Sequence, residues 1–249
     1  MLVIRVLLLC LPLLLTACRQ SWVNYDDGDT TMRGIVPTNI LRTGPALTEA
    51  FIAAFGRPAP FEAHINKGRP DWTYKLSPSA LIIFDGYAYL MADAQNVEPG
   101  NPEESACHAC PGGLMVSALK RDSRARYSAL GYRFVEGGPG YGNAALWKLR
   151  TDLFDGPALL VENYYRAQGC QTESYDLYEL NPRQMILRAT VASEVSAPWQ
   201  HGFGSAIEHG IQGISFTVHY TGQVKGTVHF IRSGEKYLPD KPESKLPSC

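Results

Sequence analysis

The chain has 249 residues and carries 23 Lys and Arg against 24 Asp and Glu, which gives a formal net charge of −1 at pH 7. This balance lacks the basic excess with which proteins bind nucleic acid, so no nucleic-acid partner is expected. The length suits one large domain or two small ones. Because 23 Gly and 17 Pro punctuate many short apolar runs, the composition favours a β-rich fold.

The N-terminal segment has the order of a secretory signal. Arg5 precedes an apolar run from Val6 to Leu15, and small residues follow it before Cys18. The apolar stretch covers roughly 15 residues, whereas a transmembrane helix needs about 20. Residues 1–17 are therefore interpreted as a signal peptide and not as a membrane span.

The ending Leu15-Thr16-Ala17-Cys18 resembles the lipobox of bacterial lipoprotein precursors. The resemblance covers residues 1–18 and implies cleavage before Cys18, which leaves 249 − 17 = 232 residues. It also implies that lipid on Cys18 anchors the protein to a membrane. An ordinary signal peptide with an incidental cysteine is the alternative. The residue after this cysteine is Arg19 and not aspartate, which resembles the pattern of lipoproteins sent to the outer membrane of Gram-negative bacteria. The cell envelope is therefore the expected location.

The mature chain is expected to begin with a flexible tether, residues 18–38, because this segment combines Asp26, Asp27 and Asp29 with few apolar residues. Residues 39–249 are expected to form a single β-rich domain, with an irregular Pro- and Lys-rich tail from Pro239 onward.

One short helix is predicted near the start of this domain, from Pro45 to Phe55. Leu47 and Phe51 lie on one face at helical spacing. Thr43 is expected to cap the helix, and the proline suits its first turn. Gly56 is expected to end it with a positive φ.

The clearest hairpin is predicted at Asp85-Gly86, which suits the two positive-φ positions of a type I′ turn between Leu81–Phe84 and Tyr87–Met91. From Ile214 to Thr221, apolar and polar residues alternate, which indicates one buried and one wet face. Ten short strands and one helix predict a mainly β fold, an antiparallel β-sandwich or an open barrel. The other strands are predicted at 114–119, 127–135, 144–150, 158–165, 175–180, 184–192, 214–220 and 227–232.

The segment Cys107-His108-Ala109-Cys110-Pro111 invites a chemical interpretation. Pro111 stands where covalent haem attachment requires a histidine. A zinc site would need further ligands that no second motif supplies. A redox-active pair would need a helix after Cys110, whereas a strand-like segment follows. Structural disulfide bonding in an oxidising envelope is the favoured interpretation.

After loss of Cys10 and lipidation of Cys18, four cysteines remain, and four allow three pairings. The favoured pairing joins Cys107 to Cys110 and Cys170 to Cys249. The second of these bonds would attach the C-terminal tail to the body of the domain.

Histidines give only weak metal candidates, and no cofactor is expected. His219 and His229 fall on the polar faces of adjacent predicted strands, and a loop centred on Val224 would place them opposite each other. His108, between two cysteines, is the third candidate. Exposed sheet histidines without a metal are the favoured interpretation.

The glycine-rich segment 137–142 lacks the Gly-Lys-Ser/Thr of a phosphate loop. It is expected to be a loop between strands, with a ligand-facing lip as the alternative. Three carboxylates are expected to have structural roles in or next to a turn and not to act in acid–base catalysis, because no motif marks a catalytic cleft. They are Asp152, Asp155 and Glu162.

The expected function is therefore a lipid-anchored envelope protein with a non-enzymatic binding or structural β-domain. Its partner would be an envelope protein or a glycan. The alternative is a periplasmic thiol-redox or other enzyme module centred on Cys107 and Cys110. The aromatic residues expected to contact a partner are Tyr87, Tyr89, Tyr141, Tyr164 and Tyr165.

Overall fold

The computed structural model describes residues 37–65, 72–84, 86–105, 110–167, 170–181, 184–197, 200–223 and 225–241. The predicted signal peptide, Cys18 and nearly all of the predicted tether lie outside the described residues, so these interpretations stay predictions. The same holds for the division into one domain, residues 39–249.

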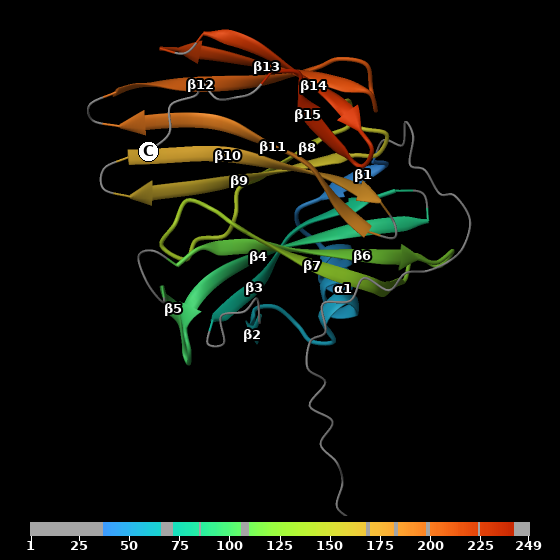
Figure 1. Ribbon diagram of the computed structural model, residues 1–249. Helices are drawn as coiled ribbons and strands as arrows, with labels where there is room; N and C mark the ends of the chain where they lie inside the picture. Colours follow the sequence, from blue (N-terminus) through green and yellow to red (C-terminus); the bar gives the residue numbers. More distant parts are fainter. Residues whose placement is uncertain are drawn as a thin grey trace, which may run out of the picture.

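The described residues form two antiparallel sheets and one short helix, which confirms the predicted mainly β, sandwich-like fold (Figure 1). The first sheet, sheet A, has the strand order β1-β3-β4-β6-β7, with β2 beside β3 and β5 beside β4. Its strands are β1 (Asn39–Leu41), β2 (Phe61–His64), β3 (Thr73–Ile83), β4 (Tyr87–Glu98), β5 (Asn101–Ser105), β6 (Gly112–Arg121) and β7 (Tyr127–Gly137).

The second sheet, sheet B, runs from β15 to β8 in strict sequence order, so each strand pairs with its chain neighbour. A parallel bridge between Gly138 and Asn163 joins the end of β7 to β9, and the two sheets meet at this seam. The strands of sheet B are β8 (Trp147–Arg150), β9 (Ala158–Ala167), β10 (Cys170–Asn181), β11 (Gln184–Ala197), β12 (Gln200–His209), β13 (Ser215–Gly222), β14 (Gly226–Ser233) and β15 (Lys236–Pro239).

Helix α1 (Pro45–Phe55) has the predicted bounds, and Gly56 ends it with a φ of 72°. The predicted cap at Thr43 is wrong, because the N-cap residue is Gly44 and no side chain caps the helix. Leu47 and Phe51 are buried against the face of sheet A that lies away from sheet B.

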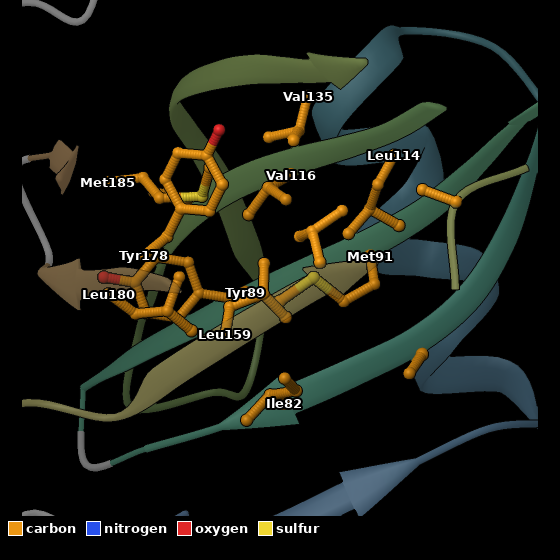
Figure 2. Close-up of a cluster of buried hydrophobic side chains, with 14 of the residues drawn as sticks. Ile82, Tyr89, Met91, Leu114, Val116, Val135, Leu159, Tyr178, Leu180 and Met185 are labelled. Carbon is orange, nitrogen blue, oxygen red and sulfur yellow. The ribbon is translucent and has the colours of Figure 1, made fainter. Parts of the chain in front are cut away.

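Three apolar layers hold these elements together. The first lies between α1 and sheet A. The second lies between sheet A and β9–β11, where Ile82, Met91 and Val116 meet Leu159 and Leu180 (Figure 2). The third lies between the opposite face of β9–β11 and β12–β15. Sheet A and β9–β11 are therefore covered on both faces, which accounts for their long apolar runs.

The third layer requires sheet B to fold back over itself. Leu160 and Leu177 point into this layer, opposite to their neighbours Leu159 and Tyr178. They meet an aromatic group in which Phe216 and Phe230 stack with ring centroids 4.8 Å apart. The predicted alternation in β13 is confirmed for Phe216, Val218 and Tyr220, whereas Ile214 precedes the strand and is exposed.

A buried ion pair joins the fold-back. The Arg188 Nε atom on β11 donates to Glu179 Oε2 on β10 at 2.6 Å, and both side chains are about nine-tenths buried. Glu179 Oε1 accepts the N–H of Gly156, and Arg188 Nη1 donates to the carbonyl of Glu235 in the β14–β15 turn. The pair thereby links β10 and β11 to the two chain segments that close over them.

The sequence analysis did not predict five of the strands, namely β1, β2, β5, β12 and β15. Four of them have five residues or fewer, too few for a period to emerge. The fifth, β12, contains Gly202 and Gly204, which favour a loop over a strand. Pro239, expected in the irregular tail, is the last residue of β15. Within the part of the chain that the structure describes, no helix has the length and hydropathy of a membrane span.

Replacement of Tyr89 by Phe is expected to stabilise the protein. Tyr89 is fully buried in the layer between the two sheets (Figure 2), and its hydroxyl has no hydrogen-bond partner among the described residues. Burial, with Tyr87 and Glu179 nearby, raises the pKa of Tyr89 well above its ordinary value. Removal of an unsatisfied buried hydroxyl is expected to raise the free energy of unfolding by about 1 kcal/mol, measured by urea titration.

Tyr178→Phe is the matched control in the same layer. Burial raises the pKa of Tyr178 to about 12, and its side chain is hydrogen-bonded to Asp176. Loss of this hydrogen bond is expected to lower the free energy of unfolding by about 1 kcal/mol. Equal effects of the two substitutions would contradict the interpretation of Tyr89.

Candidate functional site

Of the four cysteines predicted to form disulfides, only Cys110 has a described side chain. Cys107 and Cys249 lie outside the described residues, and only the backbone of Cys170 is described, as the first residue of β10. Cys110 lies just before β6 and is only 6% exposed. The two predicted disulfides and the choice between a structural and a redox role stay predictions.

The two sheet histidines share a face, but the predicted register is wrong. Thr217 lies opposite His229, and His219 lies opposite Thr227. The pairing is therefore centred on position 223 and not on Val224, and this change moves each cross-strand partner by two residues while preserving the face.

Each of these histidines contacts non-histidine partners. His219 contacts Glu208 at 2.6 Å and Thr227 at 3.2 Å, and His229 contacts Thr217 at 3.0 Å. No group of three His, Cys, Asp or Glu among the described residues is arranged to hold a metal ion. His108 lies outside the described residues.

The predicted contact tyrosines differ in accessibility. Tyr89 is fully buried, so its place in a contact surface was predicted wrongly. Tyr87 packs against the layer between the two sheets. Tyr141 is 52% exposed, and Tyr164 lines a hollow. The side chain of Tyr165 lies outside the described residues.

This hollow lies between the glycine-rich loop and strands β9 and β10. Its cavity volume is about 110 Å³. That is smaller than the range of about 300–1,000 Å³ that suits drug-sized ligands, so one sugar ring or one side chain is the scale that it fits. The lining residues are Gly138, Pro139, Leu146, Glu162, Asn163, Tyr164 and Glu173.

Polar side chains in the floor of the hollow hold one another in place. Tyr164 and Glu173 are cross-strand partners on β9 and β10. The Tyr164 hydroxyl donates to Gln171 Oε1 at 2.9 Å, and Gln171 Nε2 donates to Glu173 Oε1 at 2.8 Å. The chain of contacts orients the phenol and the carboxylate and leaves Glu173 acceptor sites for a ligand.

A cation balances the second carboxylate of the hollow. Lys148 Nζ lies 3.1 Å from Glu162 and 5.5 Å from the centre of the Tyr175 ring. The Glu162 carboxylate, as the main cause, raises the pKa of Lys148. The site therefore combines two carboxylates and one ammonium with a phenol and an amide.

The rim of the hollow is attached to the body of the protein through its backbone. Gly138 donates its N–H to the carbonyl of Glu162 at 3.1 Å, and Gly142 donates to the carbonyl of Cys110 at 2.8 Å. The carbonyl of Gly142 accepts from Asn96 at 2.7 Å. These bonds fix the backbone of the loop that carries the exposed Tyr141.

The turn carboxylates predicted to be structural are in ion pairs. Asp152 binds Arg150 at 2.6 Å, and hydrogen bonds from Arg150 are the main cause of the lowered pKa of Asp152. Asp155 binds Arg232 at 2.8 Å. Glu162 is also in an ion pair, with Lys148, but unlike the other two it lines the hollow.

Sequence analysis missed Glu173, Asn163 and Leu146 as site residues. The sequence contained a signal for Glu173. In the sequence, Gln168-Gly169 suits a two-residue hairpin turn, and pairing the flanking segments about it would put Tyr164 opposite Glu173, which is the pairing in the structure. Nothing in the local sequence brings Leu146 and the loop at Gly138 to the same place.

Comparisons with protein-family models, with curated proteins and with solved structures found no match to this chain.

Gly138→Ala is expected to disrupt the rim of the hollow. Gly138 has a φ of +117°, and an added Cβ would lie 2.6 Å from the carbonyl oxygen of Asn143. Backbone strain and the clash together are expected to lower the free energy of unfolding by about 2–4 kcal/mol, measured by chemical denaturation. Gly226→Ala is the control, because its Cβ would meet nothing within 4 Å. An equal loss in both variants would contradict the assignment of strain to Gly138.

Proposed function

We propose that this protein is a lipid-anchored cell-envelope protein whose β-domain binds an envelope glycan through the hollow beside the glycine-rich loop. The observation that carries the proposal is the hollow itself, in which Glu173 and Tyr164 are held in a hydrogen-bonded row. Lipid on Cys18, implied by the lipobox, would hold the domain in the envelope.

The chemistry of the lining supports a hydroxyl-rich ligand. Carboxylate and amide oxygens on Glu162, Asn163 and Glu173 accept hydrogen bonds from hydroxyl groups. Tyr141, exposed in the loop that also contains the lining residues Gly138 and Pro139, offers a flat apolar surface with a polar edge. The cavity volume of about 110 Å³ fits a single sugar residue of a longer chain.

The scaffold supports binding because it is rigid around the site. Strands β9 and β10 pair along ten positions and bury apolar rows on both faces next to the hollow. A preorganised site loses less conformational entropy when a ligand binds. A glycan site on this scaffold therefore needs few contacts to bind measurably.

Titration of the full chain with purified cell-wall glycan fragments tests the binding step. Saturable binding is expected, and Glu173→Gln and Tyr141→Ala are each expected to weaken it by about five-fold or more, because each removes a contact of about 1 kcal/mol. Ile211→Ala, which trims an exposed residue of a separate turn, is the control and is expected to bind normally. Absence of saturable binding to any fragment would refute the glycan assignment.

Substitution of the lipobox cysteine tests the anchor separately. Cys18→Ser is expected to abolish incorporation of a radiolabelled fatty acid. The unlabelled protein is expected either to leave washed membranes after signal cleavage or to remain as an unacylated precursor. Cys10→Ser, in the apolar run of the same segment, is the control and is expected to retain the label. Full labelling of the Cys18→Ser protein would refute the anchor.

A further inference from the structure

A basic turn stands at one end of sheet A. The end of β6 and the turn that follows it contain Lys120, Arg121, Arg124 and Arg126 against one carboxylate, Asp122. Residues 120–126 therefore have a formal charge of +4 − 1 = +3, whereas the whole chain has −1 and the remainder −4. Lys120 and Arg124 are exposed. Asp85, in the adjacent β3–β4 turn, lies outside the described residues.

The single carboxylate of this turn is used to build it. Asp122 Oδ1 accepts the backbone N–H groups of Arg124 and Arg126 at 2.9 and 2.8 Å, and Oδ2 pairs with the Arg126 side chain at 2.7 Å. The backbone hydrogen bond from Arg126 is the main cause of the lowered pKa of Asp122. Asp122 thus neutralises Arg126 and orders the turn beside the exposed Lys120 and Arg124.

This turn lies where the described chain begins. Thr38 donates its backbone N–H to Ile83 at 2.8 Å, and Arg121 donates to Gly86 at 3.0 Å. The start of β1, the β3–β4 turn and the β6–β7 turn therefore share one end of sheet A (Figure 1). Residue 37 follows Cys18 by 19 residues, a distance of about 65 Å at most and about 24 Å for a flexible chain.

The hollow lies at the other end of the same strand. Strand β7 runs from Tyr127, beside the basic turn, to Gly137, beside the hollow at Gly138. Its 11 residues extend about 35 Å at about 3.3 Å per residue. A surface that binds the basic turn would therefore leave the hollow facing away from it.

We propose that this end of sheet A, with Lys120 and Arg124 foremost, docks on the anionic lipid headgroups of the membrane that holds the anchor. The proposal rests on the proposed function, because the predicted anchor is what brings this end within reach of the membrane. Cations close to an anionic leaflet strengthen a lipid anchor, and they act within about 10 Å of the surface. Docking orients the hollow toward the opposite compartment.

Vesicle sedimentation of the full chain carrying Cys18→Ser tests the docking surface without any contribution from lipid on that residue. Binding to vesicles of 30% phosphatidylglycerol in phosphatidylcholine is expected to exceed binding to pure phosphatidylcholine vesicles by about 25-fold or more, since Lys120 and Arg124 each contribute about five-fold. Sodium chloride at about 0.5 M is expected to remove this difference. The zwitterionic vesicles measure any insertion of the apolar N-terminal segment.

Paired charge variants locate the surface. Lys120→Gln/Arg124→Gln is expected to reduce the phosphatidylglycerol-dependent binding by about 25-fold. Lys225→Gln/Lys236→Gln removes two exposed cations near the turns between β13, β14 and β15 and is the control. It is expected to leave the phosphatidylglycerol-dependent binding within about two-fold of the unsubstituted protein. An unchanged melting temperature of both variants confirms that they fold. Equal binding to the two vesicle types, equal loss in both variants, or displacement by millimolar inorganic phosphate would each overturn the proposal. Because Cys18→Ser is present throughout, these outcomes are independent of whether the labelling experiment supports the anchor.

Discussion

Burial of β9, β10 and β11 on both faces is the constraint on which the rest of the structure depends. Leu159 and Leu180 require cover from sheet A, and Leu160 and Leu177 require cover from β13–β15. Each buried apolar face contributes about 25 cal/mol per Å² removed from water, so neither face can be left open without a large loss. The chain meets this demand by folding sheet B back over itself, and the buried Glu179–Arg188 pair joins the parts that close.

The hollow is a consequence of where these apolar rows end. On β9, Leu160 and Val161 lie in the two apolar layers, and the next residues on the same faces are Glu162 and Asn163. The strand continues as a rigid element while its side chains change from apolar to polar. The seam at Gly138, where sheet A meets sheet B, adds the rim. A polar recess beside a rigid core is thus produced by the same strands that carry the core.

The two ends of strands β6 and β7 differ in charge. Cations gather at the turn that joins these strands, and carboxylates line the hollow near their other ends. Such a separation orients a protein near a charged surface over a distance set by ionic screening, about 8 Å at physiological salt. A membrane-proximal basic end and a distal glycan-binding hollow would be compatible functions of one domain, because each uses an opposite end of the same sheet.

The sequence by itself determined the elements whose signals are local. Helix α1 follows from its spacing and from Gly56, the β3–β4 hairpin from its Asp-Gly pair, and the buried face of β13 from period two. Tertiary structure decided which faces are covered and which residues meet. Tyr89 and Tyr164 occur in similar apolar-aromatic stretches, yet one is buried between sheets and the other lines the hollow. The offset of His219 from His229 depends on the centre of a turn, and the meeting of Leu146 with Gly138 depends on a seam between sheets. These contacts join strands through long-range packing, for which no pattern within a single strand contains the information.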